Sequence, residues 1–302
     1  MAPVKYQAYL LLTLAVLFWA GNFVLGRAFH MDIPPVALAF WRWAIATLLV
    51  LYPASRHLRA DWKAISGHWP IMVLLSVFGI ASFNTLVYSG LHHTQAINAL
   101  LIQSLMPVLI VLMSFVMYRD KISARLLLAI MVSLSGAVTI ICRGDVGVMI
   151  HLSLNRGDLY VFVAVICYAT YSVLLKKKPL IHPMSFVFVT FGLGSLMLVP
   201  FYLWEAMTSR SAILEPTSLL VIGYVAIFPS IVSFLCYNKG VELIGPNRAG
   251  LFIHLMPVFG SVMAVLCLDE PFYLFHALGM VLIGAGIYLT TMEKRRSSAA
   301  DR

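Results

Sequence analysis

The amino-acid sequence predicts an all-α integral membrane protein with ten transmembrane helices, arranged as two inverted repeats of five. Three observations lead to this fold class. Hydrophobic residues make up 61% of the 302 residues and charged residues 11%, against about 45–50% and about 25% in soluble domains. The apolar residues gather in ten runs near the length of about 20 residues that spans a bilayer. Finally, the second half of the chain repeats residues of the first half.

The ten apolar runs are each expected to be one helix. Because the bilayer core offers no water to satisfy backbone groups, runs this long must be helical. The first run is too long for the core of a signal peptide, and no small-x-small cleavage pattern follows it, so we expect it to be retained. The predicted spans are 6–26, 36–52, 69–91, 96–118, 126–142, 159–175, 184–204, 219–238, 249–268 and 272–292.

The basic residues predict the orientation. With the N-terminus inside, sixteen of the lysine and arginine residues fall on inner segments and four on outer loops, while Arg42 lies within a span. This excess is the positive-inside pattern, which places both termini in the cytoplasm. The net charge of +9 therefore reports topology, and no segment holds enough cations to suggest nucleic-acid binding.

A spacing of 150 residues relates the two halves. "SLMPV" at 104–108 returns as "HLMPV" at 254–258, Gly90 aligns with Gly240, and Gly136 aligns with Gly286. We expect a first repeat over 1–142, a second over 158–292, and a basic cytoplasmic tail over 293–302. A half with five helices starts and ends on opposite sides of the membrane, so the second repeat must be inverted. Inverted repeats place a binding site near the midplane, where the halves meet, and allow one half to rock against the other.

Several stretches resemble the EamA-type carriers of the drug/metabolite transporter superfamily. They are "LFWAGNFVLGRAF" at 17–29, "FWRWAIATLLV" at 40–50, "LMPVLIVLMSFVMYRDKIS" at 105–123 and "LMPVFGSVMAVLCLDEPFYLFHALGMVLIGAGIYL" at 255–289. The last is the most specific, with an acidic-Pro turn at Glu270 and Pro271 before three spaced glycines. Asp120 holds the position of Glu270 in the first half. The resemblance implies an exporter of small metabolites in a bacterial inner membrane, and it is strongest to exporters of aromatic and other neutral amino acids.

Charged residues inside the spans are few. All twelve acidic residues lie in loops, tails or span ends, which disfavours a carrier that exchanges protons for organic cations through a buried carboxylate. Arg42 lies roughly 10 Å into its helix, where an ionised side chain must face the bundle interior or a wet cavity. It either binds a substrate carboxylate or pairs with helix-end carbonyls and headgroups.

Aromatic and amide residues near the middle of the spans are the other cavity candidates. Trp19 and Asn22 share a helix face, and their counterparts in the second repeat are Tyr168 and Tyr171. His254 is a candidate for proton coupling or for helix packing. The amides either line the cavity or tie helices together. The full set of substrate-binding candidates is Trp19, Asn22, Arg42, Asn84, Tyr88, Gln103, Tyr168, Tyr171, Tyr237 and His254.

Pro107 and Pro257 are predicted to kink their helices at matching places, because a mid-helix proline removes a backbone hydrogen bond. We expect these kinks to serve as hinges. No catalytic residue, metal site or cofactor is expected. The partners are a small-molecule substrate and the lipid bilayer, and the oligomeric state is left open. Two alternatives remain, namely a multidrug or nucleoside-type efflux carrier of the same fold and a membrane-embedded enzyme acting on lipids.

Overall fold

A computed structural model describes residues 2–28, 33–145, 147–148, 153–208, 216–268 and 271–291. Every regular element within these ranges is a helix. Eight helices there are long and apolar enough to cross a membrane, and α15 (Leu274–Thr291) is a shorter apolar helix. Glu270 of the predicted acidic-Pro turn and the predicted tail 293–302 lie outside the described residues. The part that the structure describes is therefore an all-helical bundle with about eight to ten apolar helices.

The helices follow the predicted runs, with one clear difference in length. α2 continues to Gly67, well past the predicted end at 52, because Ala54 and Ile65 extend its buried face. Pro53 is accommodated inside this helix. The bounds are α1 Ala2–Ala28, α2 Pro35–Gly67, α3 Trp69–Leu75, η1 Ser76–Ser82, α4 Phe83–Leu91, α5 Ala96–Ser104, α6 Met106–Tyr118, α7 Ala124–Ile141, α9 Arg156–Leu174, η2 Leu175–Lys177, α10 Pro183–Thr208, α11 Pro216–Val225, η3 Ala226–Val232, α12 Ser233–Ile244, α13 Pro246–Leu251, η4 Phe252–His254, α14 Leu255–Leu268 and α15 Leu274–Thr291.

Two of the predicted spans contain a π-helical segment that the sequence analysis did not foresee. η1 occupies Ser76–Ser82 and η3 occupies Ala226–Val232, so the two segments are related by the same shift of 150 residues. Pro229 lies within η3 and has no N–H to donate. The hydroxyl of Ser230 instead donates to the carbonyl of Val225 at 2.6 Å. π-helical turns are rare and occur frequently at functional sites.

The predicted fourth and ninth spans are each interrupted. α5 ends at Ser104 and α6 begins at Met106, immediately before Pro107. In the second half, α13 is followed by the 3-10 turn η4 and then by α14, which begins two residues before Pro257. The prediction of one continuous ninth helix over 249–268 is therefore wrong, because this span contains the end of α13, the turn η4 and α14. Proline favours the first turn of a helix, so a new helix starts at each of these positions.

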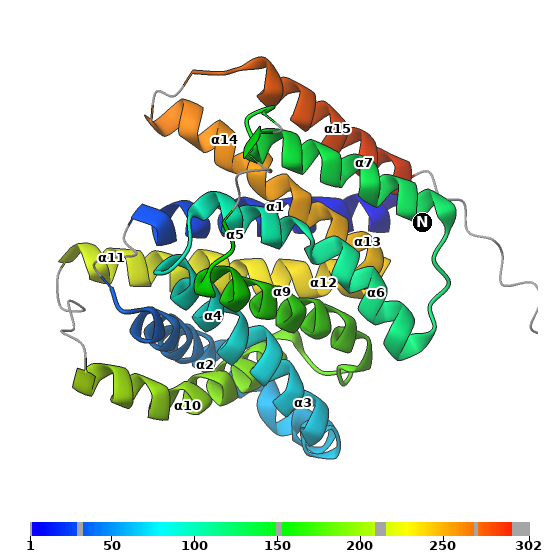
Figure 1. Cartoon of the computed structure of the whole chain (residues 1–302). Coiled ribbons are helices and arrows are strands. Elements are labelled where there is room, and N and C mark those ends of the chain that lie inside the picture. Colours follow the sequence, from blue (N-terminus) through cyan, green and yellow to red (C-terminus); the bar gives the residue numbers. More distant parts are fainter. Residues whose placement is uncertain are drawn as a thin grey trace, which may run out of the picture.

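Helices that hold the same place in the two halves pack against each other in opposite directions. Figure 1 shows α7 beside α15 along one edge of the molecule and α2 beside α10 along the opposite edge. In the first pair, a Cβ on Gly136 would lie 2.7 Å from the carbonyl oxygen of Gly279, and a Cβ on Gly286 would lie 2.6 Å from that of Ala129. The numbers rise in one helix as they fall in the other, so the two helices are antiparallel and closely packed.

The pair of α2 and α10 shows the same antiparallel relation. The ring of Phe40 stacks on Tyr202 near one end, and the ring of His57 stacks on His182 near the other. Between these outer pairs, α1 packs against α12 and α4 packs against α9. Each of these central contacts joins one half of the chain to the other, so the halves are interlocked around a shared core.

Candidate functional site

A cavity lies in this shared core. It has about 490 Å³ of space between atoms, part of which is continuous with the outside. Side chains from both halves of the chain form its wall, and most of them are apolar. The lining residues are Trp19, Asn22, Phe83, Asn84, Val87, Gln103, Met106, Tyr168, Phe234, Ile253 and Met256.

The polar part of the wall contains hydrogen-bonding atoms that have no protein partner. These are the side-chain nitrogens of Asn84 and Gln103 and the hydroxyl of Tyr168. The three residues are 5%, 5% and 1% exposed. Buried polar groups are normally hydrogen-bonded, and each exception calls for an explanation. Two amide N–H₂ groups and a hydroxyl without protein partners, on residues that line a cavity, are suited to bind a ligand that carries acceptor atoms.

The aromatic part of the wall is centred on Trp19 and Tyr168. Their ring centroids are 5.6 Å apart in an edge-to-face arrangement, and Phe83 lies 4.6 Å from Tyr168. The indole nitrogen of Trp19 donates to the carbonyl of Pro229 at 3.0 Å. This bond fixes the ring against η3, where the helix is irregular. The aromatic residues thus offer fixed faces and edges against which an apolar or aromatic group can pack.

Arg42 lies behind the wall of the cavity and does not line it. Its Nη1 donates to Asn84 Oδ1 at 2.9 Å and to the Tyr88 hydroxyl at 2.6 Å, while its Nε donates to Ser230 Oγ at 3.0 Å. It is 1% exposed, and it forms no ion pair within the described part of the chain. Its guanidinium group lies over the ring of Trp43 at 4.7 Å. Arg42 therefore holds the Oδ1 side of the Asn84 amide, and the Nδ2 side has no protein partner.

Two tyrosine–asparagine hydrogen bonds occupy equivalent places in the two halves. The Tyr88 hydroxyl donates to Asn22 Oδ1 at 2.9 Å, and the Tyr171 hydroxyl donates to Asn238 Oδ1 at 2.7 Å. Tyr171 is the counterpart of Asn22 at a spacing of 149, and Asn238 is the counterpart of Tyr88 at a spacing of 150. The same contact is thus made twice, with the two residue types exchanged between the helices.

The two bonds lie at opposite ends of the cavity. The ring of Tyr171 packs against Gly79, whereas Gly90, near Tyr88, packs against Gly157 and Val161. Because Tyr88 is nine residues beyond Gly79, the two bonds are separated by roughly 13 Å along the helices. Several lining residues, such as Asn84 and Tyr168, fall between these levels.

The structure divides the ten predicted site residues into two groups. Five of them line the cavity, and the other five pack behind it or beyond its ends. Tyr237 bonds to Ser172 at 2.9 Å, and His254 contacts Ser104 and Ser133 away from the cavity. The lining residues are Trp19, Asn22, Asn84, Gln103 and Tyr168, and the others are Arg42, Tyr88, Tyr171, Tyr237 and His254.

Sequence reasoning missed two polar residues and most of the apolar wall. Asn238 could have been found, because it aligns with Tyr88 at the spacing that relates the halves. Ser230 carries no sequence signal beyond its position next to Pro229. Phe83, Val87, Met106, Phe234, Ile253 and Met256 have the composition of ordinary packing residues. Within the described residues, no group of three or more His, Cys, Asp or Glu side chains could hold a metal ion.

Comparison with known proteins decides the family. A sequence model described as the EamA-like transporter family matches residues 7–142 and again residues 155–292. The chain belongs to the EamA-like transporter family. It is 26% identical to the uncharacterized transporter YyaM of Bacillus subtilis, over 92% of each chain. It is 25% identical to an uncharacterized transporter of Archaeoglobus fulgidus, over 96% of this chain and 99% of that one.

Two further matches extend the comparison. The uncharacterized inner membrane transporter YicL of Salmonella typhimurium is 26% identical over 76% of this EamA-family chain and 75% of its own length. A solved crystal structure with 18% sequence identity superposes with a TM-score of 0.77 and covers 95% of this chain and 96% of the other. That likeness concerns the fold alone. The family and its relatives identify the chain as a multi-pass membrane transporter.

Proposed function

We propose that this EamA-family member exports small amphipathic metabolites, most readily neutral or aromatic amino acids, across a bacterial inner membrane. The observation that carries the proposal is the cavity between the two halves, which combines unpartnered amide donors with aromatic rings. Cavities of this kind, mostly apolar with a few convergent polar groups, are the usual sites for small molecules. The direction of transport and the amino-acid cargo follow from the resemblance to amino-acid exporters described above.

The cavity suits a cargo with a carboxylate at one end. The amide nitrogens of Asn84 and Gln103 donate to the carboxylate, and the charge of Arg42 behind Asn84 favours an anionic group at this place. The hydroxyl of Tyr168 accepts a hydrogen bond from the amino group of the cargo. Trp19 and Phe83 pack against its apolar side chain. An organic cation finds no described carboxylate in this wall, which disfavours the alternative of a carrier for cationic drugs.

The two tyrosine–asparagine bonds support transport by alternating access. In this proposal, the Asn22–Tyr88 bond closes the cavity toward the outside and the Tyr171–Asn238 bond closes it toward the cytoplasm. Antiparallel packing of equivalent helices supports an inverted repeat, in which a rocking motion that opens one closure keeps the other closed. The helix interruptions before Pro107 and Pro257, together with η1 and η3, are the places where the helices bend.

Counterflow in proteoliposomes tests this function. Vesicles loaded with unlabelled phenylalanine should accumulate labelled phenylalanine, and Gln103→Ala should raise the apparent KM about tenfold, because one hydrogen bond to a charged group is lost. Gln95→Ala, which changes an exposed glutamine outside the cavity, is the matched control. Accumulation of nucleosides or cationic drugs, but not of amino acids, would contradict the assignment of the cargo. Formation of a lipid product without transport would favour the enzyme instead.

A further inference from the structure

A second cavity, lined by both charged and apolar side chains, lies one helical turn beyond the central one along α12. It has about 250 Å³ of space between atoms, part of it open to the outside. α12 contributes to both cavities, with Phe234 lining the central cavity and Asn238 lining the second. The lining residues of the second cavity are Lys178, Pro183, Phe186, Val187, Leu235, Asn238, Lys239 and Glu242.

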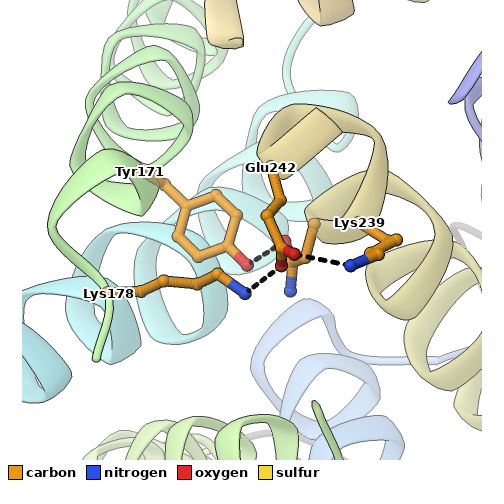
Figure 2. Close-up of polar contacts among 5 residues, drawn as sticks. Tyr171, Lys178, Lys239 and Glu242 are labelled. Atoms are coloured by element: carbon orange, nitrogen blue, oxygen red, sulfur yellow. Dashed lines mark hydrogen bonds and ion pairs between the residues drawn. The ribbon is translucent and has the colours of Figure 1, made fainter. Parts of the chain in front are cut away.

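This cavity presents more positive than negative charge. Lys178 Nζ lies 2.9 Å from one carboxylate oxygen of Glu242, and Lys239 Nζ lies 2.5 Å from the other. Figure 2 shows the two ammonium groups converging on this single carboxylate. One acidic group cannot neutralise two lysines, so the cluster retains one net positive charge.

Asn238 adds a buried donor that has no protein partner. It is 5% exposed, and its amide nitrogen lacks a hydrogen bond. Its oxygen already accepts a hydrogen bond from the Tyr171 hydroxyl, at 2.7 Å. This bond determines which side of the amide is free. An unpartnered N–H₂ group beside two ammonium groups forms a site of donors, which is the arrangement that binds an oxyanion.

We infer that this second cavity is an intake site, which binds the carboxylate of the cargo before the cargo reaches the central cavity. Asn238 and Lys178 donate to the carboxylate, and the apolar part of the cargo lies against Phe186 and Leu235. Glu242 pairs with the lysines when no cargo is bound. The inference rests on the proposed function in two respects. These are the identity of the cargo and the cytoplasmic location of the end of the helix bundle that holds the second cavity.

The intake site shares Asn238 with the Tyr171–Asn238 bond, which is proposed to close the central cavity toward the cytoplasm. Asn238 contributes its nitrogen to the site and its oxygen to the bond with Tyr171. A cargo bound at Asn238 therefore lies next to the Tyr171–Asn238 bond. In this proposal that bond must break before the cargo can move along α12 to the central cavity.

Protection of an introduced thiol tests the intake site. The variant is the full chain with Leu235→Cys as its single thiol, in which serine replaces Cys142, Cys167, Cys236 and Cys267. It is treated with a membrane-impermeant maleimide in phospholipid-free micelles. Phenylacetate should slow the modification, and its neutral amide phenylacetamide should not. Lys178→Gln should raise the half-protecting concentration about tenfold, whereas the neighbouring Lys177→Gln should leave it unchanged. Val187→Cys reports on the same cavity if Leu235→Cys does not fold.

A second reporter, Met256→Cys in the central cavity, separates the two proposals. Protection of Met256→Cys alone would overturn the intake site and leave the proposed function intact. Protection of neither thiol would overturn the intake site and also the carboxylate preference of the central cavity. If phosphatidylglycerol alone slows modification of Leu235→Cys, and phenylacetate adds nothing, the site binds a lipid phosphate and the inference is wrong.

Discussion

The imidazole Nε2 of His254 lies 2.9 Å from the carbonyl oxygen of Ser104, the residue 150 positions earlier. Since a shift of 150 residues relates the two halves, His254 contacts its own counterpart. Two equivalent residues can touch only near the axis that exchanges the halves. The other ring nitrogen of His254 lies 2.7 Å from Ser133 Oγ. His254 therefore connects α5 and α7 to η4 at the centre of the fold, at the point where the fourth predicted span is interrupted.

This placement predicts a packing role for His254 and no role in proton coupling. His254→Ala leaves the Ser104 carbonyl and the Ser133 hydroxyl without this partner, which should lower the free energy of unfolding by about 1–3 kcal/mol. His254→Gln should transport with the same pH profile as the parent between about pH 5.5 and 8, the range in which histidine ordinarily titrates. Initial rates in proteoliposomes measure the profile. Loss of the pH dependence in His254→Gln would show that the imidazole carries the coupled proton.

Arg42 should be irreplaceable by lysine. Its guanidinium group serves Asn84, Tyr88 and Ser230 at once, and a single ammonium group lacks the planar, forked geometry needed to do so. Each partner left unsatisfied should cost about 1–3 kcal/mol, and transport should fall because Asn84 loses its orientation. Thermal unfolding in detergent and counterflow measure the two effects. Ser230→Ala removes one contact and should give an intermediate result. Parent-like transport by Arg42→Lys would exclude a positioning role.

Gly79 should be required for the packing of Tyr171. A Cβ added at Gly79 would lie 2.3 Å from a ring carbon of Tyr171, which is fully buried. Gly79→Ala should therefore destabilise the protein by about 1–3 kcal/mol through overpacking. Gly223→Ala is a matched control in a helix, because nothing lies within 4 Å of its added Cβ. Equal melting temperatures for the two variants would mean that the ring of Tyr171 moves freely.

The pair of Asp120 and Lys176 links the loop after α6 to the 3-10 turn η2 that follows α9, with a distance of 2.8 Å. Burial raises the pKa of Asp120, but hydrogen bonds from Lys176 and Ser114 outweigh this effect and lower it below the ordinary value. A lowered pKa stabilises the fold above the unfolded value near 3.9, and the stabilisation is lost as the pH falls through the folded pKa. Asp120→Asn should cost less than about 1 kcal/mol at pH 7, since the pair is partly exposed. The difference from the parent should shrink below about pH 4, and a difference that grows there would contradict the assignment.

Much of the fold could be predicted from the sequence, because apolar runs of bilayer length leave the backbone no alternative to helix. The spacing of 150 residues also revealed which helices are equivalent. The π-helical segments η1 and η3 could not be foreseen, since only η3 contains a proline, Pro229, and η1 carries no residue that marks an irregular turn. The extension of α2 was missed because residues after 52 become polar on one face while Ala54 and Ile65 remain buried.

The candidate site was harder to predict than the fold. Residue type identified Trp19, Asn84 and Tyr168 as polar or aromatic groups within spans, but it could not say which side of each helix faces a cavity. Arg42 shows the difficulty most clearly. Its charge predicts a functional residue, yet the structure places it behind the wall, where it donates hydrogen bonds to Asn84 and Tyr88.

Reciprocal accessibility of the central cavity tests the account most directly. A single thiol from Met256→Cys, in a chain without native cysteines, is labelled by a membrane-impermeant maleimide in right-side-out and inside-out vesicles. Tyr171→Phe should increase labelling from the cytoplasmic side only, and Tyr88→Phe from the outer side only. Tyr202→Phe, which keeps its ring stacked on Phe40, should change neither. If both variants increase labelling from the same side, the two tyrosine–asparagine bonds do not close opposite ends of one path.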